Sequence, residues 1–357
     1  SATNSIRNSS IECISLLILG NALFSPQRLD EFLKILEQLA SRSPTSDLLA
    51  MICNAHSALI TPYSDEMLGI IAPVFEFELS VLSQSNLAEY TRLCACEFWL
   101  TICEIGHFYP VLVPLMPSLL PVLLDAMKYD QCEIDDLFAP NSSTKEANDN
   151  LYPIHHKQKG EQFEEGEEPD EDDSLGDDDR YTWNLRKCAS NTLDLIAHVF
   201  EPDSFIPVLL PLVQHSFNDC SPVRLEVGIL AIGAVGEGCY DAIEAHLAVL
   251  VPFLINCAAH PKPFVRSIAC WTLGRYPRWI CQNHQSLSDV IQALLYLIVN
   301  DSYLKVLSAA ISALGALFDE IGDGLPTLEP FLSHINDAIL YSLCHAESRV
   351  RIILYGV

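Results

Sequence analysis

Long apolar stretches marked by proline alternate with short polar turns along this chain. Three of the stretches read YPVLVPLMPSLLPVLL, FIPVLLPLV and VLVPFLI. The later two are each followed by a second stretch of helical periodicity that opens on an aliphatic residue and a base. No segment offers the period-two alternation of apolar and polar residues that a half-buried strand needs. The pattern predicts an all-helical protein built from pairs of helices.

The openings of the second helices recur at nearly constant intervals. They lie at Leu185-Arg186, Val223-Arg224, Val265-Arg266, Leu304-Lys305 and Val350-Arg351. Successive openings are separated by 38, 42, 39 and 46 residues, and Arg92 marks a less distinct earlier opening. A paired-helix period near forty residues is typical of HEAT or armadillo arrays. We therefore expect an all-α, right-handed superhelical HEAT-repeat solenoid of roughly seven or eight antiparallel helix pairs.

One of these pairs is interrupted by an acidic run. The segment from Glu161 to Arg180 reads EQFEEGEEPDEDDSLGDDDR, in which 12 of the 20 residues are Asp or Glu. Blocks of like charge repel one another and usually stay disordered, and apolar helical sequence resumes at Trp183. The predicted organisation is HEAT repeats over 1–128, a largely disordered acidic loop over 129–181, and HEAT repeats over 182–357.

Composition narrows the class of partner and the compartment. The formal net charge is −27 and half of the 357 residues are apolar. Because the scaffold is acidic even without the acidic run, it argues against binding the phosphate backbone of a nucleic acid and in favour of basic partners. The 13 cysteines lack the spacing of a small disulfide-bonded domain, and no secretory signal is evident. Reduced thiols in the cytosol or nucleus are the simplest interpretation.

The apolar stretch from Gly106 to Leu124 has no Asp, Glu, Lys or Arg and could be mistaken for a membrane span. It contains four prolines, and similar proline-marked helices recur later in the chain. The recurrence favours a soluble repeated helix, so no membrane association is expected.

The predicted helix from Phe264 to Tyr276 divides into two faces. The face expected to form the stacking core carries Val265, Ala269, Thr272, Leu273 and Tyr276. About 110° away, Ile268, Trp271 and Arg275 form a second stripe. Two interpretations remain open for this stripe: Trp271 packs against the adjacent repeat, or the stripe binds peptides, since Trp and Arg are favoured interface anchors.

The predicted helix from Trp183 to Phe200 has a comparable polar stripe of Lys187, Asn191 and Asp194. A solvated carboxylate is the ordinary interpretation of Asp194. If this stripe faces a ligand, Asp194 could instead pair with a basic residue of that ligand.

Enzyme chemistry is not indicated. The sequence has no Gly-rich phosphate loop, no GxSxG and no HExxH, so no catalytic residue, cofactor or metal is predicted. Cys94, Cys96, Cys103 and His107 lie close together, but they fall on one helix, where residues two apart point to different faces. Buried thiols are therefore expected there.

Several motifs occur in an order that closely resembles the transportin family. They are SLLPVLLDAMKYDQCEIDDL, the acidic run, TWNLRKCASNTLDLIAHVF, GILAIGAVGEGC and PFVRSIACWTLGRYPRWI. Transportins are nuclear import receptors of the importin-β superfamily. The resemblance extends from about residue 116 onward and implies a central piece of a longer receptor that shuttles between cytoplasm and nucleus through nuclear pores.

The resemblance also implies partners. Transportins bind cargo proteins through basic proline-tyrosine nuclear localisation signals, and the GTP-bound Ran GTPase releases that cargo. The Ran site is expected to lie mostly outside this chain, and nucleoporins are further expected partners. The acidic loop couples the two events in the family, which assigns a regulatory role to Glu164, Glu165, Glu167, Glu168, Asp170, Glu171, Asp172, Asp173, Asp177, Asp178 and Asp179.

Positions that match the family's motifs are expected to contact the signal. These cargo-signal residues are Asp194, Leu230, Ile268, Trp271, Arg275 and Asp319. Three positions depart from the family pattern: Ser190 and Asn191 replace small residues, and Gly356 stands where the family has an acid. Two alternatives are a HEAT-repeat structural scaffold, such as a phosphatase scaffold subunit, and an importin-β-type receptor. The long acidic insertion followed by WNLRKC favours transportin.

Overall fold

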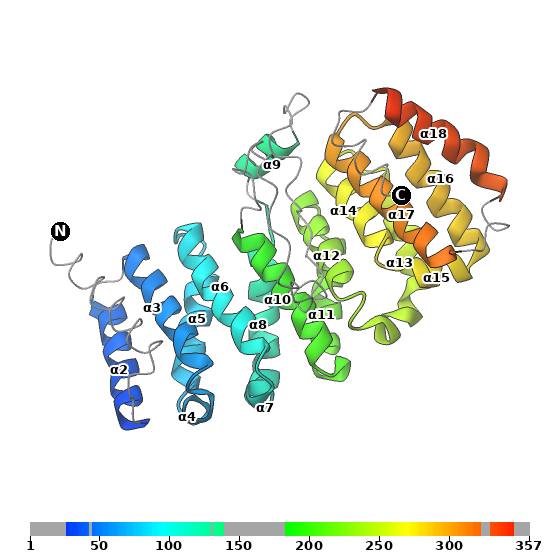
Figure 1. The fold of residues 1–357 in the computed structure, drawn as a ribbon. Coiled ribbons are helices and arrows are strands. Elements are labelled where there is room, and N and C mark those ends of the chain that lie inside the picture. The colour runs from blue at the N-terminus through cyan, green and yellow to red at the C-terminus, as the bar shows by residue number, and fades with distance from the viewer. Residues whose placement is uncertain (1–25, 43–44, 130, 139–182, 323–328, 346–357) are drawn as a thin grey trace, which may run out of the picture. The chain divides into compact units, whose positions relative to one another are not determined.

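The computed structural model of the protein describes residues 26–42, 45–129, 131–138, 183–322 and 329–345 (Figure 1). Within these ranges the regular structure is entirely helical. The chain forms two compact units. The first contains 1–127 and 183–209, and the second contains 128–182 and 210–357.

The first unit is a row of helices that runs from the N-terminal end of the described chain (Figure 1). Its elements are α2 (Pro26–Arg42), α3 (Ser46–Ile60), α4 (Ser64–Leu68), α5 (Ala72–Ser83), α6 (Glu89–Cys103), η1 (Gly106–Phe108), α7 (Tyr109–Leu112), η2 (Val113–Leu115), α8 (Met116–Ala126) and α10 (Leu185–Val199). Helix α5 packs on α6, and α8 packs on α10, so these are the pairs. The second helices α3, α6 and α10 also pack on one another in order.

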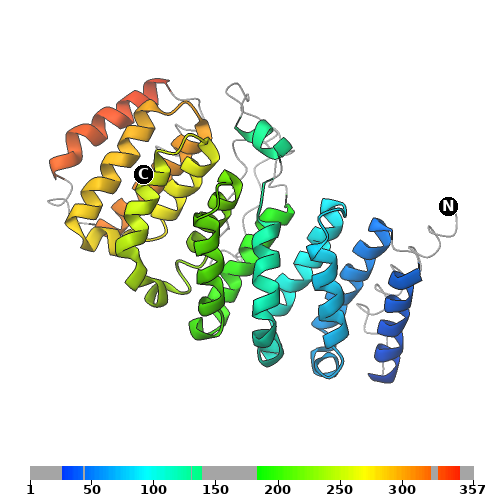
Figure 2. The ribbon, with the colours of Figure 1, turned by 180° about the vertical axis from the view of Figure 1, so that it is seen from behind.

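The second unit repeats this arrangement, as the reverse view also shows (Figure 2). Its elements are α9 (Gln131–Leu137), α12 (Pro222–Ala234), α13 (Tyr240–Ala258), α14 (Pro263–Leu273), α15 (Pro277–Gln282), α16 (His284–Asn300), α17 (Leu304–Ile321), η5 (Glu329–Phe331) and α18 (Leu332–His345). Helix α11 (Pro202–Phe217) crosses the division between the units. The second helices α12, α14 and α17 pack in order, while α13 packs on α14 and α16 on α17.

The predicted HEAT-repeat class is confirmed, and the predicted openings of the second helices match the structure. Helices α10 and α17 begin at the predicted aliphatic residues Leu185 and Leu304. Helices α12 and α14 begin one and two residues before theirs, each with a proline in the first turn. Proline is favoured there because its fixed φ suits a helix and its missing N–H has no partner to lose. The opening at Val350-Arg351 lies outside the described residues.

The bases Arg92 and Arg186 tie their helices to the ends of neighbouring first helices. Arg92 donates to the carbonyl of Leu82 at 3.0 Å and lies 3.9 Å from Asp125, near the ends of α5 and α8. Arg186 donates to the carbonyl of Met127, just past α8. These bases donate hydrogen bonds to carbonyls that the end of a helix leaves unpaired. Their positive charge also interacts favourably with the negative end of the helix dipole. The spacing of the bases is therefore a consequence of how the pairs stack.

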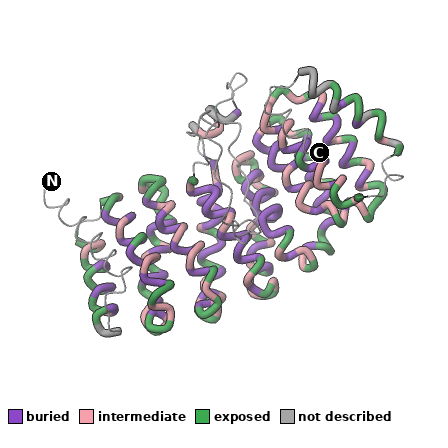
Figure 3. The backbone as a smooth tube through the Cα atoms, in the orientation of Figure 1, coloured by how far each residue is buried: buried purple, intermediate pink, exposed green. Residues whose placement is uncertain are grey.

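The second helices α10 and α12 are among the most completely buried elements (Figure 3). In α10, 12 of 15 residues are buried, and in α12 the run from Glu226 to Ala234 is buried without interruption. Helices with neighbours on several sides bury more than one stripe, so they do not show a single amphipathic face.

A short helix lies within the range that the sequence predicts to be loop. The expected loop begins at 129, but the structure places helix α9 within it, and Tyr129 and Phe138 are each only 7% exposed. Their rings lie 6.5 Å and 5.9 Å from that of Phe264 at the start of α14, and Lys305 Nζ lies 5.9 Å from the centroid of the Phe138 ring. Aromatic packing therefore orders a segment whose acidic residues suggested disorder. Residues 139–182 lie outside the described ranges.

In the described part of the chain, two helical segments are apolar and long enough to cross a membrane by length and composition alone: Gly106–Ala126 and Tyr240–Ala258. Both are first helices of pairs. Phe108, Leu112 and Met116 are fully buried, and Leu247, Val251 and Leu254 are likewise buried in α13. In each segment 39% of the apolar window is buried inside the protein.

Candidate functional site

Helix α14 carries the expected binding stripe and also one of the most regular packing faces. Val265, Ala269, Thr272, Leu273 and Tyr276 are all fully buried, as the helical wheel predicted. Ile268 is only 1% exposed, whereas Trp271 and Arg275 are half-buried. The predicted stripe is therefore split: Ile268 is part of the core, the Trp271 indole is half-buried, and the Arg275 side chain is only 11% exposed.

Trp271 lies directly against the preceding second helix, α12. A Cβ atom placed on Gly233 would overlap Cζ3 of the Trp271 ring and lie 3.0 Å from its Cε3. The indole therefore packs on the adjacent repeat, as the first interpretation expected, and it is half-buried; peptide binding by the stripe stays a prediction. An indole held in this way is a rigid aromatic surface, a common form of interface anchor.

Arg275 is held by the same helix. Its Nε donates to the carbonyl of Gly233 at 3.2 Å, its Nη2 lies 3.5 Å from Glu237 Oε2, and its Cζ lies 5.8 Å from the centroid of the Trp271 ring. The guanidinium therefore has partners on α12 and just after it, and covers part of the indole. In this arrangement Arg275 orients Trp271 and completes the end of α12.

Side chains in and just after α14 donate hydrogen bonds to carbonyls near the end of α12. Thr272 Oγ1 donates to the carbonyl of Ile229 at 3.2 Å, and the Tyr276 hydroxyl donates to that of Ile232 at 2.6 Å. Burial raises the pKa of the Tyr276 hydroxyl, so it remains a donor. Together with Arg275, these bonds pair carbonyls in and near the last turn of the helix. They also fix the separation of α12 and α14.

The remaining expected signal contacts of the second unit lie in different environments. Leu230 on α12 is fully buried, whereas Asp319 near the end of α17 is exposed. Of these two residues, Asp319 therefore presents the accessible side chain.

Asp194 belongs to α10 in the first unit. It is 3% exposed, so its interpretation as a solvated carboxylate is wrong. His198 Nδ1 lies 2.8 Å from the Asp194 carbonyl and 3.7 Å from its Oδ1. Lys187 and Ser190 on this helix are buried as well, and Asn191 is half-buried. The periodicity marked these positions as polar, but it did not show that the second helix has neighbours on that face.

Every carboxylate assigned to the regulatory loop, from Glu164 to Asp179, lies outside the described residues. The same is true of Gly356.

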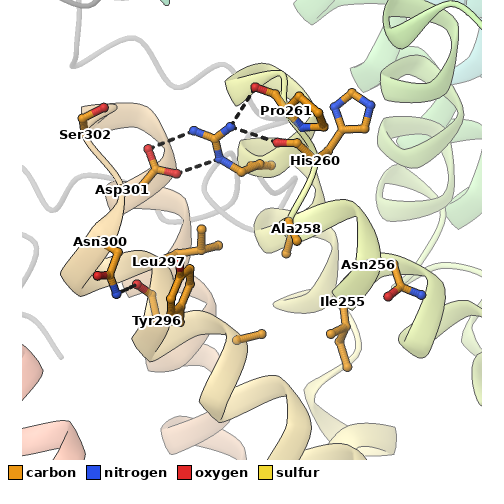
Figure 4. Close-up of a pocket in the computed structure, with 13 residues that line it drawn as sticks. Ile255, Asn256, Ala258, His260, Pro261, Tyr296, Leu297, Asn300, Asp301 and Ser302 are labelled. Atoms are coloured by element: carbon orange, nitrogen blue, oxygen red, sulfur yellow. Dashed lines mark hydrogen bonds and ion pairs between the residues drawn. The ribbon is translucent and has the colours of Figure 1, made fainter.

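A pocket of about 590 Å³ lies at the ends of α13 and α16 (Figure 4). Its apolar wall includes Ile255, Ala258 and Leu297, with the exposed ring of Tyr296 at one side. Arg266 lines the pocket but donates to both oxygens of Asp301 and to the carbonyls of His260 and Pro261. None of the expected signal residues lines this pocket.

The cysteines near the centre of α6 are structural. Cys94, Cys96 and Cys103 are 0–1% exposed, and burial raises the pKa of the Cys103 thiol. His107 Nε2 lies 3.3 Å from Asp65 Oδ1. No group of three His, Cys, Asp or Glu side chains suited to a metal occurs in the described part of the chain.

Two residues at this site were missed by reasoning from sequence. Gly233 and Glu237 hold Trp271 and Arg275 from the neighbouring repeat. The glycine in GILAIGAVG was available as a signal, because an isolated glycine inside a helix often marks a close approach.

Comparison with known proteins places this site in a recognised repeat. A HEAT-like repeat family model matches residues 228–276, the segment from Gly228 on α12 to Tyr276. A solved structure of Kap95p, described as inducing the switch loops of RanGDP to adopt the GTP-bound conformation, superposes with a TM-score of 0.74. It is 14% identical and covers 98% of this chain and 38% of its own. That similarity supports the fold.

Sequence relatives are more specific. Transportin-1 of Mus musculus is 32% identical over 361 residues, and importin subunit beta-2 of Schizosaccharomyces pombe is 28% identical over 361 residues. The alignments cover 98% and 92% of this chain. The chain spans 39% of the length of each of these two relatives.

Proposed function

This chain is a homologue of the transportins, and on that basis we propose that it forms the signal-binding middle portion of a nuclear import receptor. It binds the basic proline-tyrosine nuclear localisation signals of cargo proteins on its second helices and has no enzymatic activity. The receptor shuttles between cytoplasm and nucleus and contacts nucleoporins.

The observation that carries this proposal is the Trp271 indole on α14. It is half-buried, rests against Gly233 of the preceding repeat and is covered on one side by Arg275. A fixed aromatic ring costs little conformational entropy on binding, so it can anchor an extended peptide that must itself become ordered. The proline and tyrosine rings of the signal supply the complementary apolar surface.

Charge supports the same class of ligand. A net charge of −27 attracts basic segments over a distance set by the ionic strength. Asp319 on α17 is exposed and available to a basic residue of the signal. Asp194 on α10 is a second proposed contact, and it would have to exchange its present environment for the ligand.

Release is the second half of the proposal. Ran in its GTP state binds mostly outside this chain, and the acidic insertion between Phe138 and Trp183 transmits that event to the signal. The Kap95p neighbour's described action on RanGDP supports Ran as the class of partner. Deleting residues 139–178 from the full-length receptor should abolish release by Ran while leaving signal binding in place. Release that persists after the deletion would refute this role.

The test of signal binding is a titration of this chain with a fluorescent proline-tyrosine signal peptide. Trp271→Ala should weaken binding by about thirtyfold, as removal of an interface anchor does. Tyr296→Ala is the matched control, because that ring is 66% exposed and lines the pocket on α16 away from the expected contacts. A structural scaffold would bind none of the peptide, and an effect of both substitutions alike would contradict the assigned site.

A further inference from the structure

We propose that Gly233 is a positioning residue for signal recognition: the absence of its side chain sets the depth at which the Trp271 indole lies on α12. This inference rests on the proposed function, because Trp271 is the proposed anchor for the signal. It adds a residue that does not itself need to touch the ligand. It also predicts that substitutions at Gly233 and Trp271 have non-additive effects on signal binding.

Backbone conformation does not explain a glycine here. Among the described residues positive φ occurs at Gly322, not at Gly233, which lies inside helix α12. At such a position alanine forms a helix more favourably than glycine does. The remaining reason for glycine is close packing, and the structure shows which group packs there.

The space above Gly233 is filled by two α14 side chains. A Cβ atom at this position would overlap Cζ3 of Trp271 and lie 2.8 Å from Thr272 Oγ1. Real Cβ atoms do not approach other atoms so closely, so one of the neighbours would have to move. Thr272 is fully buried and its hydroxyl is bonded to the carbonyl of Ile229, which leaves the indole as the group that can yield.

The helices themselves resist separation. Three side chains in or just after α14, those of Thr272, Tyr276 and Arg275, donate to α12 carbonyls at 3.2, 2.6 and 3.2 Å. Moving α14 away to admit a methyl group would break buried hydrogen bonds, whereas the half-buried indole can tilt toward solvent. A tilted ring would occupy the place where an apolar ring of the signal is expected to pack.

The same displacement would affect Arg275. Its guanidinium bonds to the Gly233 carbonyl and covers the indole, so carbonyl, guanidinium and ring form one assembly. Because all of these parts meet at Gly233, a single methyl group added there would disturb both residues. The expected functional consequence is therefore large for such a small change.

The experiment is a double-mutant cycle measured with the fluorescent proline-tyrosine peptide. We expect Gly233→Ala to weaken binding about tenfold and Trp271→Ala about thirtyfold. The double variant has room for the new methyl group, so it should match Trp271→Ala at about thirtyfold instead of reaching about three-hundredfold. Independent, multiplying effects would overturn the inference.

Gly228→Ala is the matched control. Gly228 lies on the same helix, and its added Cβ would be 2.9 Å from Ser216 Cβ and 3.0 Å from Phe217 Cε1, on α11. The crowding is comparable but lies away from Trp271. This variant should lose stability without a specific loss of signal affinity in its folded fraction. Equal loss of affinity in the two alanine variants would show that general disturbance of α12 is responsible.

A second measurement separates the seating of the ring from signal binding. With 5-fluorotryptophan incorporated, the ¹⁹F line of Trp271, assigned by its absence in Trp271→Ala, should shift in Gly233→Ala without peptide. A shifted ¹⁹F line in a protein that does not bind the signal peptide would support the effect of Gly233 on the position of the indole and would refute the proposed function. An unshifted line with unchanged affinity would refute the role of Gly233. If Gly233→Ala does not fold, the double variant should fold, and failure of both would also refute it.

Discussion

Asp301→Ala should destabilise the second unit strongly, because Asp301 is the buried partner of Arg266. The Asp301 side chain is 3% exposed and that of Arg266 is 14% exposed, with Nε–Oδ2 and Nη2–Oδ1 distances of 2.7 and 3.1 Å. Removing one partner of a buried pair costs about 3–5 kcal/mol, since the other charge is left unpaired.

The structure places the expected value near the lower end of that range. Arg266 Nη1 keeps its bonds to the carbonyls of His260 and Pro261 at 2.9 and 3.1 Å, and its Cζ still lies 5.5 Å from the centroid of the Tyr303 ring. With those contacts the guanidinium keeps hydrogen-bond acceptors and an aromatic neighbour after Asp301 is removed. However, the alanine variant also loses the 2.9 Å bond from the Tyr303 N–H to Asp301 Oδ1. We therefore expect a loss of about 3–4 kcal/mol.

Urea unfolding should measure this loss in the free energy of unfolding, and hydrogen exchange should show which unit is destabilised. Because two units need not unfold together, exchange is read separately over 45–127 and over 240–321. Asp301→Ala should accelerate exchange in the second range and leave the first unchanged. Arg224→Ala is the control: its Nε lies 3.6 Å from Asp219 Oδ2, and the two side chains are 47% and 26% exposed. It should cost less than about 1 kcal/mol. Equal losses in both variants would refute the assignment of the buried pair.

Three further outcomes are expected. Burial raises the pKa of the Glu78 carboxyl, so the folded chain holds that proton more tightly and loses stability as pH rises above about 4.5; Glu78→Gln should flatten the slope seen in urea titrations. Phe138→Ala should speed hydrogen exchange in 131–138 at least about tenfold by removing the ring contact with Phe264, and unchanged exchange would contradict the packing of α9. Maleimide should label exposed Cys220 in the native protein and leave Cys103, which is fully buried with a raised thiol pKa, unlabelled until denaturant is added.

The sequence was a good guide to the fold because the repeat makes the pattern redundant. The second helices α10, α12, α14 and α17 open on an aliphatic residue and a base, and the base can have a definite physical role, since Arg266 ties the ends of α13 and α16 together. Arg92 plays the same role earlier in the chain, so the spacing of bases recorded the stacking period. The start of the insertion was harder to predict, since the packing of Phe138 on Phe264 joins residues far apart in the chain.

The candidate site was only partly predictable. A helical wheel separates the faces of one helix, and it correctly found the core of α14. It could not show that α12 supplies Gly233 beneath Trp271, nor that Asp194 is buried, because both facts depend on neighbouring helices. The contacts assigned to signal recognition remain predictions.

Photo-crosslinking tests the central claim most directly. A proline-tyrosine signal peptide whose tyrosine is replaced by benzoylphenylalanine would be bound to the protein, irradiated and mapped by mass spectrometry. The account predicts crosslinks within Pro263–Leu273 of α14 that are lost in Trp271→Ala and competed away by unlabelled signal peptide. Crosslinks concentrated instead around the pocket, at 255–261 and 296–302, or crosslinking that unlabelled signal does not compete, would contradict it.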